Sequence, residues 1–169
     1  MSRNLFDTET SGAVFSPDGL HRVRLWRVWN PELPVLVWCL LNPSIASGER
    51  SDLTLAKCIG FAKRNGYGGV ILVNLFTLIA TDPDALAKQL QVGNVWDADE
   101  HLKWACTAPV LSRVAVGWGH KSWAKTRATY VLNYLRALRR GDVLCLGTTK
   151  DGQPRHPSRL GYDTPLVQL

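Results

Sequence analysis

The sequence has few cysteines, and no two of them are close together. Cys39, Cys58, Cys106 and Cys145 are widely spaced, and no Cys-x-x-Cys motif occurs. This spacing argues against a structural zinc or iron–sulfur site. Cys39 and Cys145 lie inside apolar, strand-like runs, so we expect buried and reduced thiols. We expect neither a metal nor another cofactor.

Long apolar segments are also missing. The longest apolar run extends from Val35 to Leu41, which is far too short to span a bilayer. The opening MSRNLFDTET contains no apolar core of a secretory signal. No internal repeat, low-complexity segment or interdomain linker interrupts the sequence. We therefore expect a cytoplasmic monomer without membrane contact, folded as a single domain over residues 1–169.

Acidic residues are scarce in one part of the sequence. Residues 121–159 contain nine basic and two acidic residues, a net charge of +7, whereas the rest contains eleven basic and twelve acidic residues, a net charge of −1. Such concentrated positive charge favours a polyanionic partner, most obviously nucleic acid. A solvated basic helix face would give the same pattern, so the charge alone does not decide between the two.

Four apolar runs alternate with segments of helical spacing. The runs are predicted to be buried strands over residues 34–41, 69–75, 110–119 and 142–147. Helices are predicted over about 53–66, 95–107 and 122–140, and a short one begins at Asp82. This alternation predicts an α/β fold, namely a three-layer α/β/α sandwich with a mostly parallel four-stranded sheet over 34–160. Residues 1–30 add an N-terminal β-hairpin around the turn Pro17-Asp18-Gly19.

Polar residues follow each of the four predicted core strands. In open α/β sheets, ligands bind beyond the carboxyl ends of the strands. We therefore expect a site built from the segments that follow these strands, which are Leu41–Ser44, Asn74–Phe76, Trp118–His120 and Gly147–Leu160.

The motifs at these strand ends resemble those of the uracil-DNA glycosylase superfamily. In chain order they are LLNPS, GVILVN, VGWGHKSWAK and the Cys-containing strand DVLCLG followed by TTKDGQPRHPSRL. The resemblance spans about residues 34–160 and depends on the order of the four motifs, because each alone is short enough to occur by chance. The sequence is also similar to a group of bacterial and phage proteins with LNPS, NLF, WG and HP motifs in this order. That second similarity implies no activity.

The first resemblance implies a monofunctional enzyme that flips a nucleotide out of DNA and hydrolyses its N-glycosidic bond. His156 matches the histidine that donates to the leaving base, and Asn42 matches the Asp or Asn that positions the water. Asn74 matches the asparagine that reads the base edge. Each residue also has an explanation without a function in catalysis. His156 could be a surface histidine, Asn42 a turn asparagine before proline, and Asn74 an asparagine at the end of a strand. Glu49 and Asp52 are nearby acids that could assist the water.

The expected contacts to the DNA backbone come mainly from the loop TTKDGQPRHPSRL that contains His156. Ser158 would contact a phosphate, and Leu160 would wedge into the base stack as the base leaves. Four cations are expected to bind phosphates, namely Lys121, Lys150, Arg155 and Arg159.

Two departures from the family pattern bear on the substrate. The uracil-specific branch has Tyr where this sequence has Ser44, and a small residue leaves room for thymine or a bulkier 5-substituted pyrimidine. The family also stacks an aromatic residue on the base, but none occurs between Asn42 and Phe61. Phe76 and Trp118 are the substitutes we consider. We therefore expect a damaged, mismatched or 5-modified pyrimidine as the substrate.

Two other functions stay open at this point. The protein could be a non-catalytic nucleic-acid-binding module on the same fold, which the weak base Asn42 and the missing aromatic support. It could also be an enzyme that acts on free nucleotides or another small phosphorylated metabolite. A resemblance in fold does not separate these functions.

Overall fold

The computed structural model describes residues 11–44, 53–80, 82, 84, 86–87, 98–107, 112–139 and 142–169. Its strands are β1 (Ser11–Phe15), β2 (Arg22–Val28), β3 (Val35–Leu40), β4 (Gly69–Asn74), β5 (Arg113–Val116), β6 (Val143–Cys145) and β7 (Val167–Gln168). Its α-helices are α1 (Leu53–Arg64), α3 (Ala98–Thr107) and α4 (Lys125–Arg139). Two short 3₁₀ helices are η1 (Ser122–Ala124) and η2 (Pro157–Arg159).

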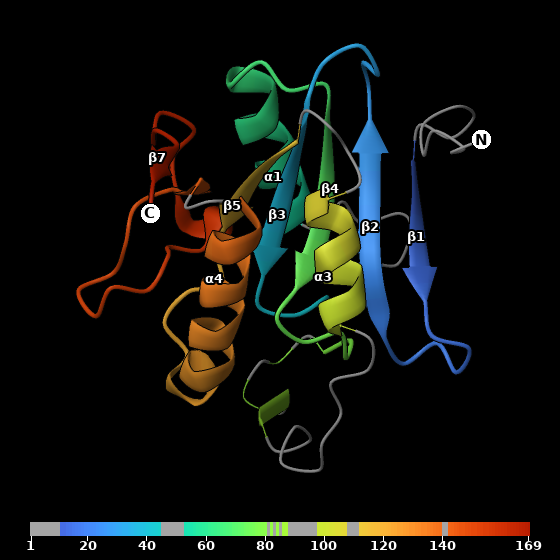
Figure 1. Ribbon diagram of the computed structural model, residues 1–169, viewed down its shortest axis with the longest axis vertical. Coiled ribbons are helices and arrows are strands. Elements are labelled where there is room, and N and C mark those ends of the chain that lie inside the picture. Colours follow the sequence, from blue (N-terminus) through green and yellow to red (C-terminus); the bar gives the residue numbers. More distant parts are fainter. Residues whose placement is uncertain are drawn as a thin grey trace.

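All described strands belong to one mixed sheet, in the order β1-β2-β4-β3-β5-β6-β7 (Figure 1). The α/β class is confirmed, but the sheet has seven strands rather than four. The central strands β4, β3, β5 and β6 pair in parallel. The predicted hairpin β1–β2 is present, and it joins the same sheet because β2 pairs antiparallel with β4. At the other side β7 pairs antiparallel with β6. These additions cover the backbone edges that a sheet of four strands would leave unpaired.

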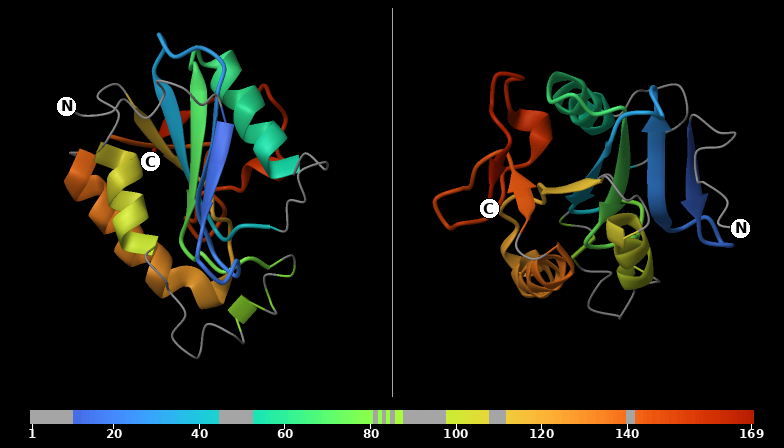
Figure 2. Two further views of the ribbon diagram at one scale, coloured as in Figure 1. Left: turned by 90° about the vertical axis from the view of Figure 1, so that its right-hand side faces the viewer. Right: turned by 45° about the horizontal axis from the view of Figure 1, so that its top comes forward.

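Helices cover both faces of the sheet, so the fold has three layers. Figure 2 shows α1 on one side and α3 with α4 on the other. Alternate residues of β3 divide between the two sides, as a strand buried on both faces requires. Trp38 packs with Phe61 of α1, whereas Val37 belongs to the core that contains Leu102 of α3 and Leu135 of α4. Each large side chain buried in this way contributes about 1.5–3 kcal/mol to the hydrophobic stabilisation.

The structure confirms the predicted ends of several elements. Helix α1 ends as expected, because Gly66 follows it with a φ of 78° that favours glycine. Asp82 caps the segment after it, since its Oδ1 accepts from the Asp84 N–H at 2.9 Å. The β1–β2 turn has Gly19 with a φ of 73°. Two predicted helix ends lie outside the described residues. They are the start at residue 95 of the helix predicted over 95–107 and the end at residues 140–141 of the helix predicted over 122–140.

The parallel strands bring their carboxyl ends to one edge of the sheet, and three loops meet there. Gly119 and Gly147 follow β5 and β6 with φ values of 79° and 81°, a backbone conformation that L side chains rarely adopt. The Gly119 N–H donates to the Pro154 carbonyl at 2.9 Å, and the Arg155 N–H donates to the Gly147 carbonyl at 3.0 Å. These bonds hold the loop after β6 against the end of β5. None of the described helices is long and apolar enough to cross a membrane.

Candidate functional site

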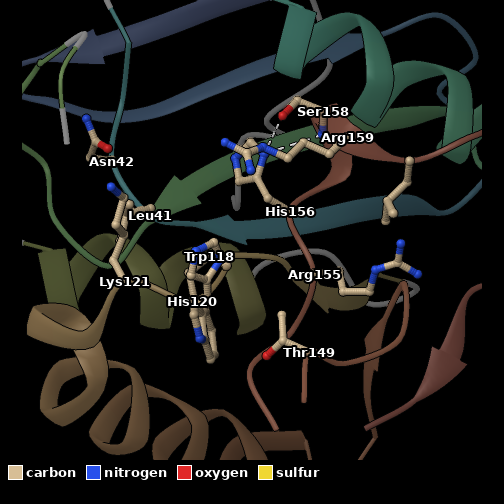
Figure 3. Close-up of a pocket in the computed structure, with 12 residues that line it drawn as sticks. Leu41, Asn42, Trp118, His120, Lys121, Thr149, Arg155, His156, Ser158 and Arg159 are labelled. Carbon is tan, nitrogen blue, oxygen red and sulfur yellow. Dashed lines mark hydrogen bonds between the residues drawn. The ribbon is translucent and has the colours of Figure 1, made fainter. Parts of the chain in front are cut away.

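A pocket of about 360 Å³ lies at the carboxyl edge of the parallel strands. Its size is near the lower end of the range for small-molecule sites, about 300–1,000 Å³, and suits one nucleotide-sized ligand. The lining residues come from the loops after β3, β5 and β6 (Figure 3). They are Leu41, Asn42, Trp118, Gly119, His120, Lys121, Thr149, Arg155, His156, Ser158, Arg159 and Leu160.

His156 lies directly before η2, with buried Pro157 at the first position of that helix. Its Nδ1 accepts from the Ser158 N–H at 3.4 Å and lies 2.7 Å from the Ser158 Oγ, as the dashed lines in Figure 3 show. A backbone N–H can only donate, so Nδ1 carries the lone pair. The proton of the neutral ring is thereby assigned to Nε2, which makes Nε2–H a hydrogen-bond donor.

Asn42 is half-buried and follows Leu41 at the end of β3. Its Nδ2 donates to the Ala80 carbonyl at 2.8 Å and to the Pro43 carbonyl at 3.0 Å. Carbonyl oxygens only accept, so these bonds assign which end of the amide carries the nitrogen. The group left to face a ligand is Oδ1, an acceptor that can orient a water molecule.

The pocket is electropositive. Its lining contains the cations Lys121, Arg155 and Arg159 and no carboxylate among the described lining residues. The Lys121 ammonium reaches the Asp84 carboxylate at 2.9 and 3.0 Å, and this hydrogen bond holds the pKa of Asp84 below its usual value. Arg155 and Arg159 are exposed. Such a lining favours an anionic ligand.

Trp118 forms a wall between the pocket and the core. Its side chain is only 3% exposed, and its Nε1–H donates to the Gln153 Oε1 at 3.1 Å. The preceding glycine allows the site loop to approach, because a Cβ on Gly117 would lie 3.0 Å from Pro157 Cδ and 3.2 Å from the Arg155 carbonyl oxygen. The Gly-Trp-Gly sequence is thus required by close packing as well as by turn geometry.

Four predicted site residues lie outside the pocket lining. Asn74 is 4% exposed, and its backbone is in register with Leu40 in the β3–β4 ladder. Phe76 packs against Trp123 with ring centroids 5.5 Å apart, so it belongs to the core. Ser44 is half-buried and Lys150 is exposed, and neither lines the pocket.

Leu160 differs from its predicted role. It contributes to the pocket lining, but it is 5% exposed and packs in the core cluster that contains Leu36 and Phe61. Its carbonyl accepts from the Lys57 ammonium at 2.7 Å. A wedge has to protrude toward the base stack, so the structure does not support this function for Leu160.

Two further polar residues, His120 and Thr149, line the pocket; both lie in segments expected to build the site, but neither was given a role there. The signal for His120 was its position directly after the Trp-Gly motif. The signal for Thr149 was only its place in the loop after β6, because its position in the pocket depends on how that loop folds back, with Thr148 bridging to Pro154. Glu49 and Asp52 lie outside the described residues. In the part of the chain that the structure describes, no group of three His, Cys, Asp or Glu residues could hold a metal ion.

The fold and the site together define an α/β protein with a cationic ligand pocket at the carboxyl edge of its parallel strands. Residues 22–158 match the family described as "Protein of unknown function (DUF1643)". This match covers more than half of the chain, so the protein belongs to that family. No curated protein and no solved structure matches the chain.

Proposed function

We propose that the pocket is a glycosylase-like active site that accepts a pyrimidine nucleotide of DNA and hydrolyses its N-glycosidic bond. One observation carries this proposal. Asn42 and His156, which come from the first and the last parallel strand, line one nucleotide-sized pocket together with Arg155 and Arg159. The uracil-DNA glycosylase-like motifs of the sequence point to the same two residues.

The proposed reaction uses a hydrogen-bond donor and an acceptor. As the C1′–N bond breaks, its electron pair moves to the base, and Nε2–H of His156 donates to the base oxygen on which negative charge develops. Oδ1 of Asn42 accepts from a water molecule whose oxygen forms the new bond to C1′. The proton that this water loses passes to solvent or to the departing base, because an amide is a poor base. The reaction is therefore slower than with an Asp at this position.

The first motif also bears on the substrate, although Ser44 itself lies outside the pocket lining. Since the motif has Ser44 where the uracil-specific branch has Tyr, we propose a damaged, mismatched or 5-modified pyrimidine. Trp118 and Phe76 both belong to the same core cluster, but only Trp118 also lines the pocket, so we assign the contact with the base to Trp118. Base reading has to come from groups other than Asn74, and His120 and Thr149 are the polar candidates in the lining.

A second candidate is an enzyme for free nucleotides. The buried position of Leu160 favours it, because no protruding side chain is needed to separate bases when the substrate is a monomer. Three cations in one small pocket also suit the dianionic phosphate of a nucleoside monophosphate. This candidate predicts release of base from the monomer with at least the efficiency seen on an oligonucleotide.

The deciding experiment is a substrate panel. The full chain is incubated with labelled oligonucleotides that carry uracil, a T·G mismatch or 5-modified pyrimidines, and abasic sites are revealed with alkali. In parallel, the corresponding free nucleotides are assayed for released base. We expect abasic sites with at least one oligonucleotide and none with the His156→Ala variant. Tight binding without any product would instead support a non-catalytic binding module, and product from monomers alone would support the second candidate.

A further inference from the structure

Helix α1 carries only positive charge. Its sequence LTLAKCIGFAKR contains Lys57, Lys63 and Arg64 and no acidic residue. Lys63 and Arg64 are exposed, and Lys57 is half-buried. Since η2 contacts α1, the exposed Arg159 of η2 lies on the same side of the molecule, as the neighbouring positions of α1 and the C-terminal segment in Figure 2 illustrate.

No ion pair between these charges and a carboxylate is found among the described residues. In the described part of the chain, ion pairs engage Arg113, Lys121 and Arg127, which pair with Asp142, Asp84 and Asp99 respectively. None of these pairs involves a basic residue of α1, or Arg155 or Arg159. Lys103, Lys125 and Arg136 are exposed and also outside these pairs, so what distinguishes the cations of α1 is their position beside η2 and the pocket.

Tyr162 holds two of these cations in place. The Lys57 ammonium lies 4.2 Å from the centroid of its ring, and the Arg64 guanidinium lies 4.6 Å from it. The Tyr162 ring packs against Gly60, where an added Cβ would lie 2.3 Å from the ring. The same ring makes an edge contact with Phe61. The two cations are seven residues apart on the helix, which corresponds to a rise of about 10 Å. Both charged groups nevertheless converge on the one ring of Tyr162, and these contacts favour that position for them.

This arrangement begins next to the pocket. Arg159 lines the pocket, the carbonyl of the next residue, Leu160, accepts from the Lys57 ammonium, and Tyr162 follows two residues later. At the far end of α1, Lys63 lies 5.2 Å from the ring centroid of Trp29. The cations lie over the rings of Tyr162 and Trp29, so this surface offers a row of positive charges for the phosphates of a strand rather than free rings for its bases.

We infer that this surface, which we call the α1 track (Lys57, Lys63, Arg64, Arg159 and Tyr162), binds the part of a single-stranded nucleic acid that leaves the pocket. The inference rests on the proposed function, since it requires a nucleotide of the strand in the pocket. This narrows the proposed substrate to a damaged or 5-modified pyrimidine in a strand that is already unpaired, and it excludes a mismatch, because Leu160 is packed in the core and provides no wedge to open a duplex. The exposed Asp163 lies beside the track and is expected to set one of its borders.

The inference is tested by fluorescence anisotropy with the full chain and oligodeoxythymidylates of roughly four and roughly sixteen nucleotides. Affinities are measured over a series of salt concentrations for the wild type and for the double variant Lys63→Gln/Arg64→Gln. The matched control is Lys103→Gln/Arg136→Gln, which removes one lysine and one arginine from exposed positions of α3 and α4 on the other face of the sheet. A duplex of the same sequence and heparin complete the set of probes.

We expect the longer single strand to bind more tightly than the short one, the duplex and heparin. We expect the track variant to weaken this binding about tenfold and to reduce the slope of log K against log salt by about 1.4, since each neutralised phosphate contributes about 0.7 for single strands. The control variant should leave both quantities unchanged. Equal losses in the two variants, equal affinity for heparin, or no length dependence would each overturn the α1 track.

The test separates this inference from the proposed function. If the track fails while abasic sites still form, the pocket chemistry stands without this surface. If the strand binds as expected but no base is released from any substrate, the track stands and the glycosylase activity fails.

Discussion

The imidazole of His156 turns its Nδ1 toward Ser158, which lies two residues further along the chain and presents both its N–H and its Oγ to that nitrogen. The relationship is local, so it does not depend on a distant part of the fold. It places the proton of the neutral ring on Nε2 and holds the ring at one side of the pocket. Preorganised donors of this kind act without reorganisation when charge develops on a leaving group.

The first prediction concerns this donor. The His156→Ala variant should lower the single-turnover rate on the best oligonucleotide substrate by about 10²–10³-fold, the usual effect of removing one preorganised donor. Ser158→Ala should cost less, about tenfold, because Nε2–H remains and only its orientation is lost. Thermal unfolding of both variants checks the fold, which should persist because His156 is only half-buried. Equal losses in the two variants would contradict a direct contact between His156 and the substrate.

The second prediction concerns Asn42 and stability. In an Asn42→Asp variant, the two donations to the Pro43 and Ala80 carbonyls are lost, and a carboxylate faces those oxygens instead. We expect the free energy of unfolding to fall by about 1–3 kcal/mol at neutral pH. Urea denaturation measures this loss.

The pH dependence of this loss identifies its cause. Repulsion from the carbonyl oxygens raises the folded-state pKa of the new carboxyl above its unfolded value of about 3.9. The variant is therefore least impaired below that value, and the loss increases as the pH rises through the folded-state pKa. Asn42→Ala serves as the control, because its loss should not change with pH. A pH-independent loss for the aspartate variant would show that Asn42 is not bonded to these carbonyls.

Much of the fold could be predicted from local patterns. The apolar runs that form β3 and β4 are buried on both faces, and Gly66 ends α1, because periodicity and left-handed glycine positions are local signals. The pairing of β2 with β4 could not be predicted, since a short alternating hairpin carries no signal for which edge it joins. The two-residue strand β7 was missed because it is exposed and is defined by its backbone pairing with β6 rather than by side chains.

The site was predictable to the extent that it lies at strand ends. The convergence of Asn42, Trp118 and His156 follows from parallel strands whose carboxyl ends share one edge. The prediction was less accurate within each motif, because position along the chain does not give the direction of a side chain. Asn74 ends its strand inside the sheet, and Leu160 turns toward the core.

The third prediction concerns the cysteines. All four thiols are buried in the structure, and burial raises the pKa of Cys39 well above its usual range and that of Cys145 in the same direction. Thiolates are the reactive form, so the native protein should not react with a colorimetric disulfide reagent at neutral pH. All four thiols should react once the protein is unfolded in guanidinium chloride. Fast reaction of even one thiol in the native protein would contradict the burial of that cysteine in the core.

The fourth prediction concerns Asp84, which competes with any anionic ligand for a cation of the pocket. Its carboxylate accepts two hydrogen bonds from the Lys121 ammonium, and Lys121 lines the pocket. The Asp84→Asn substitution removes this carboxylate, so it should free the Lys121 ammonium and tighten the binding of inorganic sulfate severalfold. Isothermal titration calorimetry measures the affinity. The control is Asp142→Asn, which removes the partner of Arg113 at 3.0 Å and should leave sulfate binding unchanged because that pair is not part of the pocket lining.

Acidification should abolish the difference between the wild type and Asp84→Asn. The hydrogen bond from Lys121 lowers the pKa of Asp84 in the folded protein, so the ion pair is fully present above the unfolded value and is lost as the pH falls through the folded one. The substitution leaves the other charged groups of the pocket unchanged, so they contribute equally to both affinities. The two affinities should therefore converge at acid pH and diverge toward neutrality. A constant ratio across this range would mean that the variant alters the pocket by some route other than the release of Lys121.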